Sequence, residues 1–179
     1  EVVLADGTIA WLGGEMRESL GYDLRGILIG SEGTLAVVTK VLVRLLPLPE
    51  TVKTMLAIFP EIQQAGTAVS QIIGSGIVPA AIEMMDSLTI QAVEQAINAG
   101  YPQDAGAVLL VEVDGLRETV DGESTEVEAV CRESGAVDVR TATDSETRER
   151  LWKGRKSALG ALGRLAPNYY LLDGVVPRT

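Results

Sequence analysis

The order of apolar and polar residues divides the chain into two parts with different rhythms. Residues 1–49 carry short apolar runs separated by glycine-rich turns, a pattern typical of β-strands. The apolar runs on either side of Asp6-Gly7 predict a hairpin, because this dipeptide favours a two-residue turn. Further buried strand is expected over 24–29 and over 35–46. This all-strand part is too small to bury a core of its own.

Pro47 and Pro49 end this part and mark the candidate domain boundary, since proline interrupts sheets and favours extended backbone. Beyond them the apolar residues alternate between the spacing of strands and that of helices. Strands are expected over 52–59, 80–85, 107–113, 137–140 and 169–176, and helices over 61–73, 88–97, 120–135 and 144–165. This order predicts an α+β fold with an antiparallel sheet, ferredoxin-like in outline.

Composition describes an ordinary globular chain and removes several functional classes. The chain is 46% hydrophobic and 22% charged, which allows a packed core. Its net charge of −10 argues against nucleic acid or an anionic membrane as a direct partner. No apolar run reaches the length of a membrane span. The absence of histidine and the single Cys131 exclude histidine-based catalysis, a disulfide framework and a multi-cysteine metal site within the chain, so we expect no metal site and a reducing, cytoplasmic compartment.

The turn Gly30-Ser31-Glu32-Gly33-Thr34 is the sharpest local motif. Its two glycines permit positive φ angles and let a ligand approach bare backbone. A strand is expected after the turn, which argues against dinucleotide and P-loop motifs, since both place a helix N-terminus at the phosphate. On spacing alone the motif is either a ligand-binding turn or, more commonly, a glycine-rich hairpin without a ligand.

Arg155 is the candidate for binding an anion. At 100° per residue, a helix over 143–165 places it in the apolar stripe with Leu151 and Leu159. A guanidinium in such a place requires an anionic partner. That partner is either a carboxylate of the chain, for which Glu83, Glu112 and Asp173 are candidates, or the carboxylate of a substrate held by two hydrogen bonds.

Four further residues have simpler interpretations beside the functional ones. Trp152 is expected to pack in the core. Asp173 is either an acid or base or, more simply, a turn residue. Glu83 is a possible inward-facing acid, and Asp86 is expected to cap a helix.

Three segments carry a resemblance to a known family. Residues 21–35, which read Gly-Tyr-Asp-Leu-Arg-Gly-Ile-Leu-Ile-Gly-Ser-Glu-Gly-Thr-Leu, resemble the late part of the PCMH-type FAD-binding domain of vanillyl-alcohol-oxidase-like flavoproteins. Residues 151–156 and 168–178, with Trp-x-x-Arg and Asp-Gly-x-x-Pro-Arg, are similar to the C-terminal cap domain of FAD-linked oxidases, in the family of the FAD-binding D subunit of bacterial glycolate oxidase. By this resemblance 1–49 are the last strands of an FAD-binding domain and 50–179 a truncated substrate domain.

The resemblance implies an FAD enzyme that oxidises a small 2-hydroxy acid. Gly30, Ser31, Glu32, Gly33 and Thr34 would line the FAD, and Val37 and Val38 would contact it through their backbone. Arg155 would hold the substrate carboxylate. Electrons would leave through partner subunits with FAD and iron–sulfur centres, and any membrane association would come through these subunits.

Some family features are absent or altered. The family's pyrophosphate-binding loop and histidine-rich segment would lie outside the chain, which begins at Glu1 without an initiator methionine. We therefore expect a fragment that is inactive alone and does not retain FAD, and whose unpaired strand edges favour self-association. Ala36 stands where the family usually has glycine. Leu171 stands near the position of a lysine in relatives that act on D-2-hydroxyglutarate, which favours a monocarboxylate such as glycolate or D-lactate.

Two alternatives remain at this point. The first is a D-lactate dehydrogenase of the same family. The second is a non-catalytic α+β module that assembles with partners through an exposed sheet.

Overall fold

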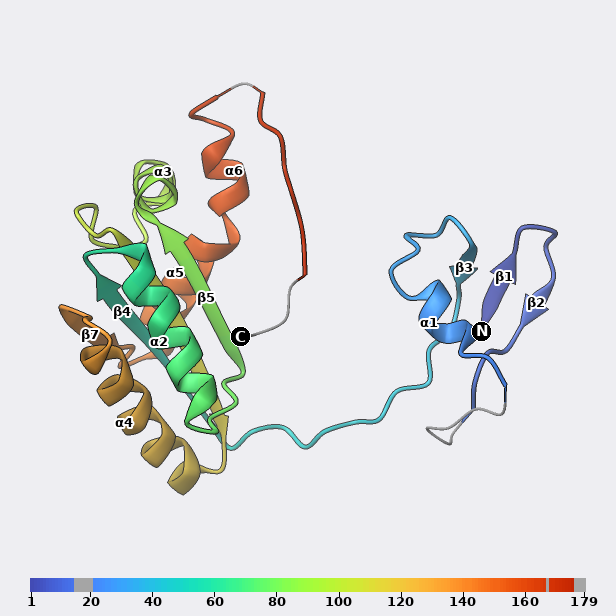
Figure 1. Cartoon of the computed structure of the whole chain (residues 1–179), viewed down its shortest axis with the longest axis horizontal. Helices are drawn as coiled ribbons and strands as arrows, with labels where there is room; N and C mark the ends of the chain where they lie inside the picture. The colour runs from blue at the N-terminus through green and yellow to red at the C-terminus, as the bar shows by residue number, and fades with distance from the viewer. Residues whose placement is uncertain (15–20, 167, 176–179) are drawn as a thin grey trace. The chain divides into compact units, whose positions relative to one another are not determined.

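The computed structural model describes residues 1–14, 21–166 and 168–175. The chain divides into two compact units, Glu1–Pro47 and Leu48–Thr179, whose elements are labelled in Figure 1. The division falls beside the two prolines at 47 and 49.

The first unit contains a three-stranded antiparallel sheet in the order β2-β1-β3. Strand β1 (Val2–Leu4) pairs with β2 (Ile9–Ala10) and with β3 (Ala36–Val38). The predicted hairpin is confirmed, and Gly7 occupies its turn with a φ of 83°. Val2 and Ala36 are the buried apolar residues among those described in this unit, so the sheet has almost no core.

The prediction of a buried strand over 24–29 was wrong. This segment contains α1 (Leu24–Leu28), and none of its residues is buried. The Asp23 carboxylate caps the helix by accepting a hydrogen bond from the Gly26 N–H at 3.2 Å. A short apolar run does not by itself distinguish strand from helix, and Asp23 was the missed signal.

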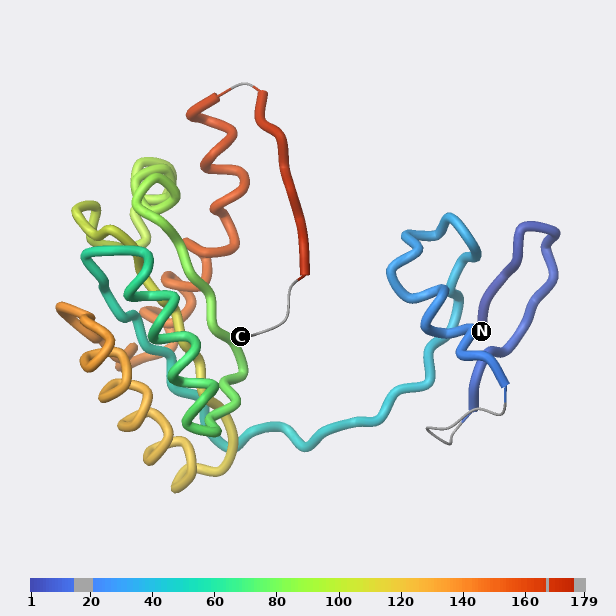
Figure 2. The backbone as a smooth tube through the Cα atoms, viewed as in Figure 1, coloured from blue at the N-terminus to red at the C-terminus, as the bar shows by residue number. Residues whose placement is uncertain are grey.

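The strand predicted over 35–46 ends at Val38. From residue 39 to 49 the chain has no regular secondary structure and runs as an extended segment (Figure 2). The apolar side chains of Val41–Leu46 are exposed there. The strand prediction failed beyond Val38 because β3 pairs only with the three residues of β1.

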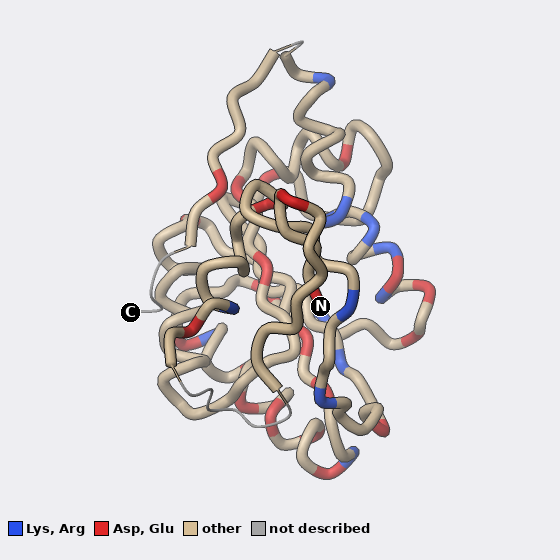
Figure 3. The backbone as a smooth tube through the Cα atoms, turned by 90° about the vertical axis from the view of Figure 1, so that its right-hand side faces the viewer, with Lys and Arg blue, Asp and Glu red and all other residues tan. Residues whose placement is uncertain are grey.

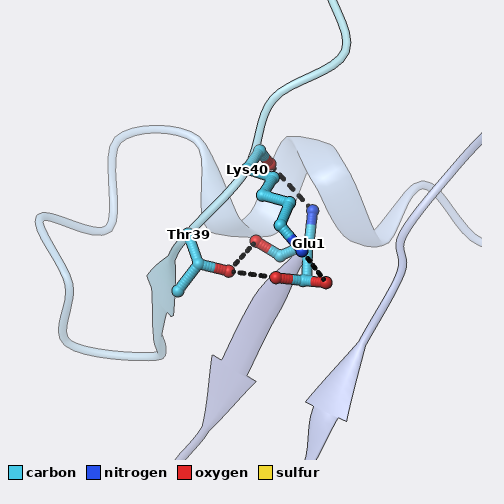
Figure 4. A network of polar contacts seen from close by, with 3 residues as sticks. All are labelled: Glu1, Thr39 and Lys40. Carbon is cyan, nitrogen blue, oxygen red and sulfur yellow. Dashed lines mark hydrogen bonds and ion pairs between the residues drawn. The ribbon is translucent and has the colours of Figure 1, made fainter.

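A small polar network joins the start of β1 to the residues after β3 (Figure 4). The Glu1 carboxylate accepts hydrogen bonds from Lys40 Nζ and Thr39 Oγ1, each at 2.9 Å. These two hydrogen bonds lower the pKa of Glu1 below its ordinary value. Lys40 Nζ also lies 6.0 Å from the centre of the Trp11 ring, within the range of a cation–π contact.

The second unit is built on a four-stranded antiparallel sheet in the order β5-β6-β4-β7. These strands are β4 (Thr51–Phe59), β5 (Ala81–Asp86), β6 (Ala107–Gly115) and β7 (Asp138–Thr141). Strand β6 lies between the first two strands, which are joined through a helix. This is the split arrangement of a ferredoxin-like sheet, so the predicted α+β class is confirmed.

Helices cover both faces of this sheet (Figure 1). One core forms with α2 (Ile62–Gly74) and α4 (Arg117–Glu133), and includes Met55, Ala57 and Phe59 of β4. The other forms with α3 (Ser87–Ile97), α5 (Ser145–Lys156) and α6 (Ala158–Leu162), and includes Leu56 and Ile58. Because successive side chains of β4 point to opposite faces and both faces are covered there, this strand is continuously apolar from Met55 to Phe59.

The predicted elements from 52 to 140 are confirmed, whereas the last part of the chain differs. The helix predicted over 144–165 is divided at Ser157 into α5 and α6. The strand predicted over 169–176 is absent from the described residues 168–175, which are exposed, while residue 176 lies outside the described part. Within the described residues, no helix is both long enough and apolar enough to cross a membrane.

Candidate active site

Helix α5 is attached to the sheet by Glu112 of β6, whose carboxylate receives four hydrogen bonds. Thr54 Oγ1, directly opposite on β4, donates at 2.5 Å. Arg148 of α5 donates through Nε and Nη2, each at 2.9 Å, and Trp152 donates through Nε1 at 2.7 Å. Glu112 therefore holds two successive turns of α5 against β6.

The environment of Glu112 favours its charged form. Burial alone would raise its pKa, but the hydrogen bonds from Arg148, Thr54 and Trp152 outweigh this effect, and the pKa lies below its ordinary value of 4.5. A carboxylate with a lowered folded-state pKa stabilises the fold above its unfolded pKa, and this stabilisation is lost as the pH falls through the folded pKa.

We expect Glu112→Gln to lower the free energy of unfolding by about 1 to 2 kcal/mol at neutral pH, since the amide places a donor where the carboxylate accepts from Arg148. The half-exposed Arg148 limits the size of the loss. The difference between wild type and variant should shrink as the pH falls below 4.5. Urea unfolding at several pH values measures it, and a difference that is independent of pH would contradict the assignment.

A close contact fixes α5 near its C-terminal end. Gly154 packs against Tyr101, where a Cβ would lie 2.6 Å from Tyr101 Cε2 and 2.7 Å from the Ala99 Cβ. The buried Tyr101 hydroxyl donates a hydrogen bond to the Leu151 carbonyl oxygen, and burial raises the pKa of this phenol. The backbone that carries the next residue, Arg155, is therefore held at a defined distance from the rest of the unit.

Arg155 forms an ion pair with Glu83 of β5. Its Nε and Nη2 lie 2.9 and 2.8 Å from the same oxygen, Glu83 Oε2. The two side chains are 36% and 35% exposed, so the pair lies at the margin of the apolar stripe. Among the described residues, neither Arg155 Nη1 nor Glu83 Oε1 has a hydrogen-bond partner. The guanidinium thus satisfies the requirement for an anion within the chain and keeps donors that a further carboxylate can reach.

The other candidates from the sequence are placed differently. Trp152 is partly buried against the core, as predicted, although its hydrogen bond to Glu112 was not anticipated. Asp86 caps α3 by accepting from the Thr89 N–H at 2.9 Å. Asp173 is exposed and has no polar partner among the described residues, so it is not brought together with Arg155. Pro177 and Arg178 of the family motif lie outside the described residues.

The role of Arg148 was not predicted from the sequence. This residue lies two helical turns before Arg155 and therefore on the same side of α5. This spacing was the available signal. Arg148, Lys153 and Lys156 also border a pocket of about 470 Å³ beside α5. Acidic residues outnumber basic ones by 25 to 15, and both kinds are spread along the chain (Figure 3). The last turn of α5 differs from this average, because Lys153, Arg155 and Lys156 make it locally basic.

The glycine turn of the first unit has the predicted open backbone. Gly30, Glu32 and Gly33 have positive φ angles of 86°, 50° and 78°. Their N–H groups have no acceptor among the described residues, whereas the Thr34 N–H and hydroxyl both donate to the Ser31 carbonyl oxygen. A Cβ on either glycine would meet nothing within 4 Å. The turn thus offers bare N–H donors on an accessible surface.

The class of protein follows from comparison with protein families. Residues 48–179 match the family model described as the C-terminal domain of FAD-linked oxidases, and the chain belongs to this family. The match covers the same residues as the second structural unit, Leu48–Thr179. The resemblance drawn from the sequence motifs is confirmed.

Particular relatives narrow the comparison. The chain is 46% identical to the glycolate oxidase subunit GlcD of Escherichia coli K12, over 99% of this chain and 36% of that protein. It is 45% identical to the GlcD subunit of Bacillus subtilis, over 100% of this chain and 38% of that protein. A D-lactate dehydrogenase of Archaeoglobus fulgidus is 34% identical over 87% of this chain. The chain spans about a third of the length of these curated relatives.

Solved structures show the same fold at lower identity. An alkyldihydroxyacetonephosphate synthase covers 92% of this chain with a TM-score of 0.62 and 20% identity, and the match spans 33% of that protein. A p-cresol methylhydroxylase covers 84% with a TM-score of 0.61 and 18% identity, and the match spans 36% of that protein. These likenesses concern the fold alone.

The described residues fit an FAD cofactor in one respect. The three unpartnered N–H groups of the glycine turn can donate to carbonyl or phosphate oxygens, and a ligand can reach them without meeting a side chain of the two glycines. Val37 and Val38 follow on β3, with exposed fractions of 59% and 55%. The polar N–H groups of the turn therefore lie next to the exposed apolar surface of Val37 and Val38. A cofactor that combines polar groups with an aromatic ring requires both kinds of surface.

Proposed function

We propose that this chain is part of an FAD-dependent enzyme that oxidises a small 2-hydroxy acid such as glycolate to the 2-oxo acid. The observation that carries the proposal is the Arg155 guanidinium, which is fixed on one edge and accessible on the other. The names of the related glycolate oxidase subunits and of the D-lactate dehydrogenase support a 2-hydroxy acid as substrate.

In this proposal each unit contributes its own part. Arg155 of the second unit binds the substrate carboxylate through charge-assisted hydrogen bonds and so orients the α-carbon. The backbone of Gly30–Thr34, with that of Val37 and Val38, holds FAD in the first unit. When bound, FAD supplies the acceptor for the hydride of the α-carbon. Asp173 is the weaker candidate for acid or base chemistry, because its side chain is exposed and unpartnered among the described residues.

The proposal includes partner proteins. The two GlcD relatives are named as subunits of glycolate oxidase, which supports a multi-subunit oxidase. We infer that further subunits with FAD and iron–sulfur centres carry the electrons away and provide any contact with a membrane. The location we propose is the cytoplasm, where thiols stay reduced, and the buried thiol of the single cysteine, Cys131, is compatible with it.

The test is anaerobic reduction of bound flavin in the complete protein. We expect glycolate or D-lactate to bleach the flavin absorbance, and the corresponding amide of either acid to be without effect, because Arg155 requires a carboxylate. Faster reduction by glycolate supports the glycolate oxidase activity, and faster reduction by D-lactate supports the second candidate. A protein that holds FAD but is reduced by neither acid would contradict the proposal and favour the non-catalytic module.

A further inference from the structure

The ion pair between Glu83 and Arg155 joins the edge strand β5 to helix α5 within the second unit. We propose that Glu83 is a positioning residue, which orients the Arg155 guanidinium so that its remaining donors can receive a carboxylate. This inference rests on the proposed role of Arg155. It also unites the two partners that the sequence left as alternatives, since the guanidinium would serve an internal carboxylate and an external one together.

The geometry of the pair leaves room for a second carboxylate. Arg155 directs Nε and Nη2 to a single oxygen of Glu83, so one edge of the planar guanidinium is occupied. Nη1 and the second N–H of Nη2 form the other edge, which has the fork geometry that carboxylates bind. No described residue occupies Nη1. The binding of the second anion therefore does not require Glu83 to leave.

Helix α5 does not depend on Glu83 for its position. Glu112 holds Arg148 and Trp152, and Gly154 packs against Tyr101, at other points of the helix. The Glu83–Arg155 pair is also about one third exposed on both sides, and pairs of this kind add little to stability. Removing Glu83 should thus free the Arg155 side chain while leaving the fold and the helix in place.

Two effects of Glu83 on a bound anion oppose each other. Its hydrogen bond and ion pair with Arg155 reduce the conformational freedom of that long side chain, which favours binding. Its negative charge repels the substrate, which disfavours binding, although exposure weakens this repulsion. If Glu83 positions Arg155, orientation must outweigh repulsion, and the sign of the change in KM on its removal decides between them.

The kinetic test compares Glu83→Ala with Glu83→Gln in the complete, FAD-loaded protein. We expect Glu83→Ala to raise the KM for the 2-hydroxy acid about tenfold with a much smaller change in kcat, because the Arg155 side chain must then be ordered by the substrate itself. Glu83→Gln keeps an acceptor oxygen for Arg155 Nε and should have a KM near that of the wild type. A lower KM in both variants, or an unchanged KM in Glu83→Ala, overturns the proposal.

A second readout is independent of activity. In ¹⁵N spectra of the 179-residue chain, the Arg155 Nε–H signal should be protected from exchange in the wild type and in Glu83→Gln, and lost in Glu83→Ala. The control is Glu128→Ala, which removes a similar carboxylate from Arg132 on α4 and should leave the Arg155 signal unchanged. An Arg155 signal that persists in Glu83→Ala overturns the proposal.

The two experiments separate the inference from the proposed function. If no 2-hydroxy acid reduces the flavin of the wild type, the proposed function fails, and the spectra still decide whether Glu83 orders Arg155. If the wild type is active and Arg155→Ala is impaired while Glu83→Ala is not, the function stands and only the role of Glu83 is refuted.

Discussion

Arg155→Ala is expected to lower kcat/KM for the 2-hydroxy acid about 100-fold in the complete protein. The variant removes the group that binds the substrate carboxylate, and the loss of such a charged hydrogen-bonding partner costs about 2 to 4 kcal/mol. Arg155→Lys should raise KM and lower kcat by a smaller factor, because an ammonium is a point charge without the planar fork of the guanidinium. Steady-state kinetics of the three proteins measure both effects.

Stability provides the control for this prediction. The Glu83–Arg155 pair is partly exposed, so both variants should keep a free energy of unfolding within about 1 kcal/mol of the wild type. Arg132→Lys, on the other side of the sheet in α4, should change neither kinetics nor stability. A loss of folding together with unchanged kinetics in the folded fraction would identify Arg155 as part of a structural ion pair only.

Gly106→Ala should destabilise the second unit by about 3 kcal/mol or more. Gly106 precedes β6, and its N–H donates to the Phe59 carbonyl oxygen at 3.0 Å. A Cβ at this position would lie 1.8 Å from the Pro60 carbonyl oxygen and 2.5 Å from its carbon. Both atoms belong to the backbone, so the two chain segments must separate. Overpacking typically costs about 1 to 3 kcal/mol and occasionally more, and a clash with backbone belongs at the upper end of this range.

The matched control is Gly66→Ala in the middle of α2. A Cβ there would meet nothing within 4 Å, and alanine favours helix over glycine by up to about 1 kcal/mol. Thermal unfolding should therefore move in opposite directions for the two variants. Equal melting temperatures for Gly106→Ala and the wild type would contradict the close approach of Pro60 to β6.

The second unit could be predicted well from the sequence because its patterns are long. Strands β4 and β6 are nearly continuous apolar runs, and each lies between covered faces of the sheet. The helical wheel for the segment that forms α5 predicted an anionic partner for Arg155, and the structure pairs it with Glu83. The helical wheel could not show which carboxylate is the partner of Arg155. Glu83 is more than seventy residues away in the sequence, and the pairing depends on the position of β5 in the sheet.

The first unit and the last described residues were predicted less well, for physical reasons. The run 24–29 is too short for its period to distinguish helix from strand, and it forms α1. The run 169–175 has the apolar character of a strand, but no described strand pairs with it. An apolar run becomes a strand only when a neighbour accepts its backbone hydrogen bonds.

The two tryptophans of the chain fall one in each unit. Trp11 is exposed in the first, and the indole of Trp152 is hydrogen-bonded to a buried carboxylate in the second. Their fluorescence should therefore differ in emission maximum and in quenching by iodide. Replacing either one by phenylalanine would leave a single intrinsic probe, and the melting of each half could be recorded separately without any added dye.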